Sequence, residues 1–166
     1  MGRRLLLTAL VLAGVLAVAA YRPRDPWDAP TGPRPWLTAD DVVTLQLEAL
    51  RRNGELRNDR GIRIALRFAS PSTREHLGAD TFAARLRQPY FRAILQHRSA
   101  SIVARAERDG RAAFRVRLDR RNKAEAPTVF LFLLSRRYLP DCNGCWVTDL
   151  VHPWPTGVQR RTGIDV

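Results

Sequence analysis

Residues 102–118 read IVARAERDGRAAFRVRL, and this stretch decides the fold. Asp109-Gly110 at its centre is a strong signal for a two-residue hairpin turn. Before the turn, Ile102, Ala104 and Ala106 alternate with polar neighbours, as in a strand. After the turn the alternation is clearer still, with one apolar and one basic face. The apolar face holds Ala112, Phe114, Val116 and Leu118, and the basic face holds Arg111, Arg115 and Arg117.

Two further strands follow this hairpin. A polar loop over 119–127 leads to TVFLFLL at 128–134, a continuous apolar run that predicts a strand covered on both faces. A turn from Pro140 to Gly144 then leads into a last strand, Cys145 to Val151. Strand patterns, alternating or continuously apolar, therefore extend from residue 102 to the end of the domain.

Helical patterns occupy the chain before the hairpin. Thr38 and Asp41 have the spacing of a capping box, and the helix they begin is stopped by Asn53-Gly54. A second helix is expected over 61–69, ended by Ser70-Pro71, a third is capped by Asp80, and a short helical turn covers 91–95. Helices followed by strands predict an α+β fold, with the helices on one face of a curved antiparallel sheet of about four strands.

The N-terminus carries a basic start, Met-Gly-Arg-Arg, and an apolar stretch without charges over residues 5–20. A helix of that length rises about 24 Å, less than the roughly 30 Å of a bilayer core. Small residues at 17–20 suit signal-peptide cleavage, while Tyr21 and Arg22 could extend an uncleaved anchor to the interface. Either alternative predicts export, as a periplasmic or secreted domain, or anchorage in the inner membrane with the domain outside the cytoplasm.

Composition divides the chain into four parts. Residues 1–20 are the signal peptide or membrane anchor, and 21–36 form a linker with five prolines, which cannot be a helix or a central strand. Residues 37–152 are long enough for one folded α+β domain. Residues 153–166 are a basic tail that we expect to fray.

The chain carries a formal charge of +12, and Lys123 is the only lysine among its 28 basic residues. Arginine forks suit phosphate and carboxylate groups, so the outward arginines of the second strand suggest anionic lipid as one partner. The arginines are spread along the chain and no nucleic-acid motif accompanies them. A biased composition that places arginine at solvated positions is the simpler explanation, and we do not expect a nucleic-acid partner.

Four strings carry a resemblance to known proteins: LQLEAL at 45–50, Gly61-Ile62, FASP at 68–71 and CWVTD at 145–149. They resemble a bacterial and plant family described only as a domain of unknown function. The order of elements is similar to the nuclear-transport-factor-two superfamily, with its SnoaL-like and cystatin-like cone. The resemblance implies a cone that can hold a small ligand. It implies no chemistry, because many members of the superfamily are not enzymes.

Cys142 and Cys145 form a CxxC pair. In an exported protein they can close a small disulfide across the turn before the last strand. Free thiols, a redox pair and a metal site are the alternatives. Redox pairs of the thioredoxin type begin a helix, and a zinc site needs two further ligands that no second CxxC supplies. We therefore expect neither metal nor cofactor.

Candidate site residues are few. Asp149 and His97 are the acid and base that a cone-shaped site would use, and His152 is a second histidine at a strand end. Alternation places Asp149 on the face of Val147 and Val151. Its simpler role is a structural hydrogen bond, and the simpler role of each histidine is a locally bonded side chain.

Binding candidates complete the site prediction. Polar groups for a pocket could come from Gln46, Glu48 and Tyr90, and an aromatic wall from Trp146. The alternative for Glu48 is a pair with Arg52, four residues on. The sequence thus predicts an exported or tethered module that binds a small ligand or partner protein without catalysis. A hydrolase or isomerase of the same cone fold, and an anionic-lipid-binding domain, are the alternatives.

Overall fold

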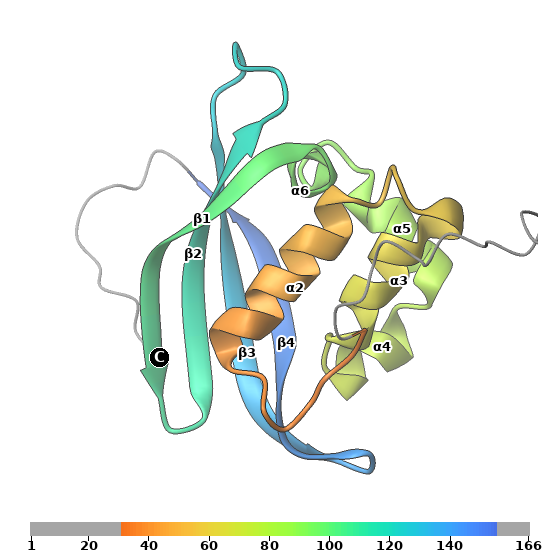
Figure 1. Cartoon of the computed structure of the whole chain (residues 1–166), viewed down its shortest axis with the longest axis vertical. Coiled ribbons are helices and arrows are strands. Elements are labelled where there is room, and N and C mark those ends of the chain that lie inside the picture. Colours follow the sequence, from red (N-terminus) through yellow and green to blue (C-terminus); the bar gives the residue numbers. More distant parts are fainter. Residues whose placement is uncertain (1–30, 156–166) are drawn as a thin grey trace, which may run out of the picture.

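The computed structural model describes residues 31–155, in which helices come first and four strands follow (Figure 1). The strands form one antiparallel sheet in the order β1-β2-β3-β4. The predicted α+β class with about four antiparallel strands is confirmed. Residues 1–30 and 156–166 lie outside the described residues, so the predicted apolar helix, most of the linker and most of the tail stay predictions.

The helical layer comprises five α-helices and one 3₁₀ turn within residues 31–155. Thr38 begins the first helix with the predicted capping box: its hydroxyl accepts from the Asp41 N–H (3.2 Å), and its own N–H donates to the Asp41 carboxylate (2.9 Å). The elements are α2 (Ala39–Arg51), η1 (Arg57–Asp59), α3 (Arg60–Arg67), α4 (Pro71–His76), α5 (Ala79–Leu86) and α6 (Arg92–Leu95).

Two predicted helix boundaries are wrong. The helix expected over 61–69 ends at Arg67, and Ser70-Pro71 begins α4 instead. The Ser70 hydroxyl accepts from the Thr73 N–H (3.4 Å), and proline at the first helical position loses no hydrogen bond. Gly78, rather than Asp80, precedes α5, and Asp80 lies inside its first turn. In both cases a short helix follows directly on another element, so sequence periodicity over six to eight residues is too brief to locate it.

The sheet consists of β1 (His97–Arg108), β2 (Arg111–Arg120), β3 (Thr128–Leu139) and β4 (Cys142–Trp154). The predicted hairpin turn is present: Asp109 and Gly110 have φ of 49° and 71°, the positive values that a two-residue turn of type I′ requires. The four apolar residues predicted to face inward on β2 are all buried: Ala112, Phe114, Val116 and Leu118.

Three features of the strands differ from prediction. A bulge in β1 between Ile102 and Ala104 breaks the expected alternation, so Ile102 pairs with Val116 and Ala104 with Arg115. In β3 the inner side chains Phe130, Phe132 and Leu134 are buried, while Leu131 and Leu133 on the other face are half-buried rather than fully covered.

β4 is also longer than predicted, since it begins at Cys142, inside the expected turn, and continues through Pro153 and Trp154, beyond the expected end of the domain. Pro153 is tolerated because β4 lies at an edge of the sheet, where a missing N–H costs no ladder bond.

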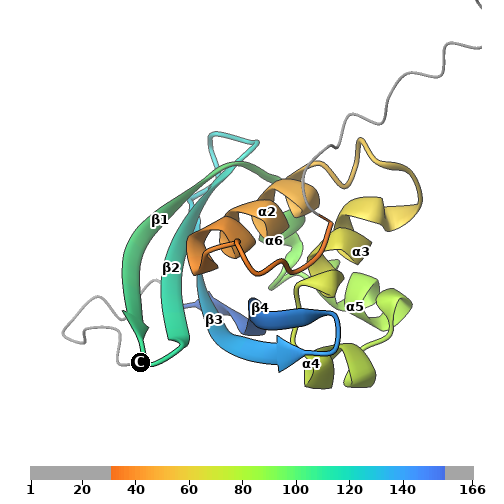
Figure 2. The same cartoon turned by 60° about the horizontal axis from the view of Figure 1, so that its bottom comes forward.

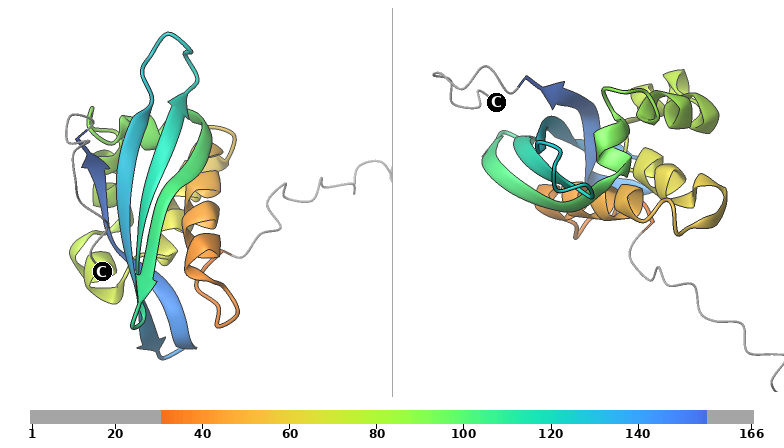
Figure 3. Two further views of the ribbon diagram at one scale, coloured as in Figure 1. Left: turned by 90° about the vertical axis from the view of Figure 1, so that its left-hand side faces the viewer. Right: turned by 90° about the horizontal axis from the view of Figure 1, so that it is seen from above.

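The helices cover one face of the sheet and leave the other face of β1, β2 and β3 without a helix (Figures 2 and 3). The core lies between the two layers and is built from aromatic and aliphatic side chains of the inner face. Its largest fully buried members are Phe68, Phe114, Phe130, Phe132, Ile62 and Ile94.

Helices α2 and α3 approach each other at Gly61. A Cβ at this position would overlap the backbone carbonyl of Ala49 and lie 3.0 Å from the Asn53 Cα. The Asn53 side chain fixes the same contact, because its Oδ1 accepts from the Ile62 N–H (3.0 Å) and its Nδ2 donates to Asp59 (3.1 Å). Only glycine allows this crossing of two backbones.

Gly61→Ala is therefore expected to lower the free energy of unfolding by about 2–3 kcal/mol, because the two helices must separate to admit the methyl group. Gly54→Ala is the matched control, since no atom lies within 4 Å of its Cβ position; its effect should stay within about 0.5 kcal/mol. Urea unfolding followed by circular dichroism measures both. Equal stability of the two variants would contradict the close approach.

Candidate functional site

An open hollow of about 360 Å³ lies between the helical layer and β4. Its apolar floor comes from helices α2, α3, α5 and α6 and from the sheet, with Leu50, Ala65, Phe82, Leu86, Ile94 and Phe132 among the residues that line it. Its polar rim consists of Ser72, Thr73, His76, Arg85 and Asp149. An apolar cavity of this size with a few polar groups at its edge is the usual form of a small-ligand site.

Gln46 and Thr148 form the buried polar part of the hollow's wall. The Gln46 Nε2 donates to the Ala65 carbonyl of α3 (3.0 Å), and its Oε1 accepts from the Thr148 hydroxyl of β4 (2.6 Å). Both residues are about 4% exposed, so little of either side chain reaches solvent. Gln46 was predicted as a binding residue; the structure places it at the hollow, with both ends of its amide already hydrogen bonded.

The backbone of β4 is also tied to the helical layer at this point. The Thr148 N–H donates to the Phe68 carbonyl (2.8 Å), and the Ser70 N–H donates to the Thr148 carbonyl (2.8 Å), as a parallel bridge centred on Ala69. The outer edge of β4 is therefore paired here rather than open. The link leads directly into α4, which carries three of the rim residues.

A β-bulge at Asp149 gives this acid its position. Leu133 pairs with Leu150 and Leu134 with Thr148, so Asp149 has no partner across β3. The extra residue breaks the expected alternation: Val147 pairs with Ser135 and Val151 with Phe132, which places these two valines on opposite faces. Bulges of this kind redirect a side chain.

The Asp149 carboxylate lies at the rim of the hollow with about a third of its side chain exposed. Its ion pair is with Arg137 of β3, at 3.5 Å. Asp149 was predicted from its place among apolar neighbours, and the structure does bring it to the hollow. The bulge that places Asp149 there could not be predicted from the sequence pattern.

His97 does not share this hollow. It is 1% exposed, and its Nδ1 lies 2.7 Å from the Ile94 carbonyl. Burial lowers the pKa of the imidazole, because the interior disfavours its charged form. The ring lines a second hollow of about 270 Å³ between α2 and β1. The predicted acid, Asp149, and the predicted base, His97, thus lie in two separate hollows.

The second hollow also contains Glu48, in a pairing that differs from prediction. Glu48 bonds to Arg51, three residues on, at 2.6 Å, and not to Arg52, which pairs with Glu55. The hydrogen bond from Arg51 lowers the pKa of the Glu48 carboxyl. Both pairs are partly exposed, so each contributes little to stability.

The remaining candidates lie elsewhere. Tyr90 is 76% exposed, Trp146 is buried in the core, and His152 is exposed with its Nδ1 against the Pro153 carbonyl. The reasoning from sequence missed the rim residues of α4 and α5. The signal that could have found them is Ser70-Pro71 as a helix start, because it places Ser72, Thr73 and His76 on one short helix.

Two rim residues have contacts that leave part of their surface for a ligand. The His76 Nδ1 lies 2.6 Å from the Ser72 carbonyl, and the ring is exposed. The Arg85 guanidinium lies 5.5 Å from the centre of the Phe91 ring, a cation–π distance. The rim therefore offers a cation, an anion and hydroxyl groups around an apolar floor.

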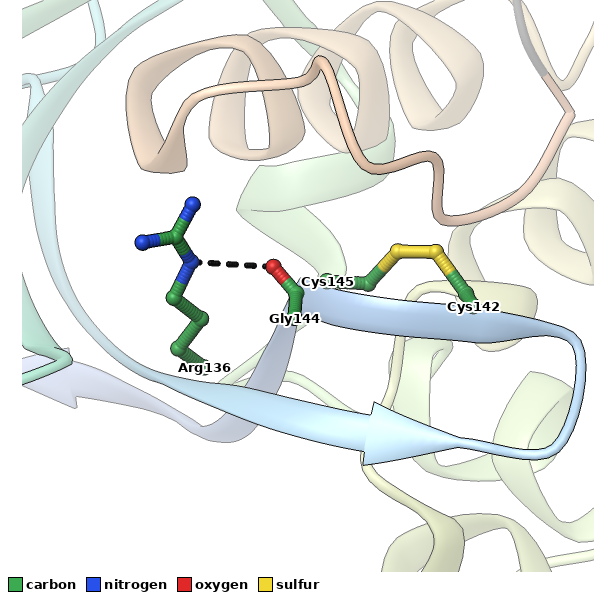
Figure 4. Close-up of a disulfide and its surroundings, with 4 residues drawn as sticks. All are labelled: Arg136, Cys142, Gly144 and Cys145. Atoms are coloured by element: carbon green, nitrogen blue, oxygen red, sulfur yellow. Dashed lines mark hydrogen bonds between the residues drawn. A yellow bond between two sulfur atoms is a disulfide. The ribbon is translucent and has the colours of Figure 1, made fainter.

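Cys142 and Cys145 are joined as a disulfide at the start of β4, with their Cα atoms 5.8 Å apart (Figure 4). Both are buried, at 6% and 0% exposure, which shields the sulfurs from solution thiols. The neighbouring Gly144 carbonyl accepts from the Arg136 Nε of β3 (2.9 Å). The pair thus belongs to the β3–β4 hairpin, away from the ligand hollow.

Comparison with known proteins adds no identity: no family model, curated protein or solved structure matches this chain. Within residues 31–155, no group of three or more histidine, cysteine or acidic side chains could hold a metal ion. In the same residues no helix is long and apolar enough to cross a membrane.

Thr148→Val is expected to destabilise the fold by about 1–3 kcal/mol, because it leaves the buried Gln46 Oε1 without a donor. Thr44→Val makes the same chemical change at an exposed position of α2 and should change stability by less than about 0.5 kcal/mol. The urea midpoints of the two variants and the wild type measure these changes in stability. A similar loss in both would show that the Gln46–Thr148 bond contributes nothing special.

Burial of His97 predicts a pH dependence of stability. Its pKa in the folded state lies below the unfolded value of about 6.5, so the unfolded chain takes up a proton first and stability falls as the pH drops below that value. The lowered carboxyl pKa values act only nearer pH 4. When the pH is lowered from 7 to 5, the free energy of unfolding should decrease in the wild type and in His152→Gln. In His97→Gln it should stay constant. A level wild-type profile would contradict this.

Proposed function

We propose that this protein is a non-catalytic binding module whose hollow beside β4 takes a small ligand with an apolar body and a polar end. The observation that carries the proposal is the hollow itself: about 360 Å³, an apolar floor from four helices and the sheet, and polar groups confined to the rim. Burial of an apolar body supplies most of the affinity, and the rim selects the polar end.

The arrangement of titratable groups supports binding over catalysis. A general acid or base must reach the reacting atom, and usually a second group orients it. Asp149 has an arginine as its partner, and His97 lies in the other hollow. Of the two predicted catalytic residues, the alternative of a hydrolase or isomerase retains only Asp149 in this hollow.

The arginines of β2 give the lipid-binding alternative little support. Arg117 pairs with Asp119 (3.1 Å), and the Arg115 guanidinium lies 5.8 Å from the centre of the Trp154 ring. Two of the three outward cations on this strand are therefore already engaged. A flat membrane would have to compete with both contacts.

The place of the module in the cell is part of the same proposal. The apolar residues 5–20 support export or anchorage, and the proline-rich residues 21–36 would separate the domain from a membrane. The domain would then face the periplasm or the exterior, where a disulfide such as Cys142–Cys145 persists. We retain the proposed kinship with the nuclear-transport-factor-two superfamily because its ligand cone agrees with a hollow between helices and sheet.

The test is native mass spectrometry and titration of the full chain with lauric acid, dodecylamine and dodecanol. The proposal expects at least one of them to bind as a single equivalent, with the charge preference identifying the polar end. Leu77→Trp at the edge of the hollow should weaken binding about ten-fold. The larger side chain would keep about two methylene groups of the ligand out of the hollow, a loss of about 1.6 kcal/mol.

Val103→Trp is the matched control, since Val103 is exposed on β1 outside the hollow. It should leave binding unchanged. Failure of all three probes to bind, or equal affinity in the two tryptophan variants, would overturn the proposal.

A further inference from the structure

The outer face of α3 and the η1 turn before it carry a cluster of arginines that do not line the ligand hollow. Arg57, Arg60, Arg63 and Arg67 line a hollow of about 430 Å³ on the surface, together with Thr31, Asn58 and Ile64. All four arginines are exposed. Among the described residues that line this hollow there is no carboxylate, and we call it the arginine hollow.

Helical geometry explains why these cations lie together. Arg60, Arg63 and Arg67 are spaced by three and four residues, which brings side chains to one face of a helix. The opposite face, with Gly61, Ile62 and Ala65, is buried against α2 and the core. These three arginines therefore project from a helix that packs closely against α2 at Gly61.

Within the described part of the chain, three of the four have no ion pair with an acid, unlike some of the other arginines. Within residues 31–155, Arg51, Arg87, Arg105 and Arg120 each pair with a carboxylate. In the same range no ion pair joins Arg57, Arg63 or Arg67 to an acid. The nearby Asp59 bonds to Arg87 and Asn53, which lower the pKa of its carboxyl, and the charge of Arg63 also lowers that pKa.

A cluster of like charges on two helical turns is repulsive, and a bound anion would relieve that repulsion. Guanidinium groups match phosphate oxygens in geometry as well as charge. The arginine hollow thus has the chemistry of a phosphate-recognition surface. Among the residues of this hollow that the structure describes there is no aromatic side chain on which a nucleic-acid base could stack, which favours a phosphate headgroup over a nucleic acid.

We propose that the arginine hollow docks the domain onto the anionic phospholipid headgroups of a membrane. Its position in the chain supports this occupant. Thr31 lies in the hollow, where the Arg67 Nη1 donates to its hydroxyl (3.2 Å). The apolar stretch ends at residue 20, and the intervening chain spans at most about 40 Å when extended. A membrane that holds residues 5–20 is therefore within reach of α3.

The test is arginine footprinting with phenylglyoxal and mass spectrometry on the full chain reconstituted in vesicles. Vesicles of phosphatidylcholine alone are compared with vesicles that also contain phosphatidylglycerol. Docking should slow modification of Arg57, Arg63 and Arg67 several-fold in the anionic vesicles only. Arg98 of β1 and Arg111 of β2 lie outside the arginine hollow and should react equally in both. Protection should disappear in about 1 M salt, where the screening length is about 3 Å.

A paired variant tests the surface itself. In R63Q/R67Q, protection of the remaining Arg57 should be lost, since each basic residue near an anionic surface contributes about five-fold to binding. R98Q/R111Q removes the same charge from β1 and β2 and should keep Arg57 protected. Thermal unfolding of both variants establishes that each is folded.

Several outcomes would overturn the proposal. Equal protection in neutral and anionic vesicles would mean burial by the anchor rather than recognition of headgroups, and no protection in either would mean no docking. Equal effects of the two double variants would exclude α3 as the surface. Protection by inorganic phosphate or by single-stranded nucleic acid without vesicles would assign the hollow to a soluble anion or to a nucleic acid.

Discussion

The Gln46–Thr148 hydrogen bond is the contact on which the arrangement of this domain depends. One buried amide joins α2 to the backbone of α3 on one side and to β4 on the other. A buried amide without partners would cost several kcal/mol, so the layers are stable only in the geometry that satisfies both of its ends. The backbone bridge between Phe68–Ser70 and Thr148 adds two further hydrogen bonds at the same place. Apolar packing drives the layers together, and these polar bonds fix how they meet.

The ligand hollow follows from that constraint. Thr148 must face the helices to reach Gln46, and Val151 must face them to pack on the core, although the two are three residues apart. In a regular strand, positions three apart lie on opposite faces. The bulge at Asp149 resolves this conflict, and it leaves an acid at the rim of the apolar floor. The position of this candidate residue is thus a consequence of packing on either side of it.

Helix α3 gives the domain two surfaces of opposite character. Its inner face contributes Ala65 to the apolar hollow, and its outer face carries the arginine hollow. Gly61 allows α3 to pack closely against α2, so the orientation of both surfaces relative to the rest of the domain is fixed. Headgroup docking on one face and binding of an apolar molecule on the other would be compatible in one small domain, because they use different sides of the same helix.

The sequence by itself determined the local elements: the capping box at Thr38, the Asp109-Gly110 turn and the inward face of β2, because each depends on a few adjacent residues and a fixed period. It also indicated Asp149 and Gln46 as site candidates. The start of α4 also has a local signal, Ser70-Pro71. The tertiary structure alone decided the length of β4, the bulges between Ile102 and Ala104 and at Asp149, and the separation of His97 from Asp149. Those features arise from contacts between residues far apart in the chain, such as Gln46 with Thr148, and a local pattern carries no information about which distant partner satisfies a buried polar group.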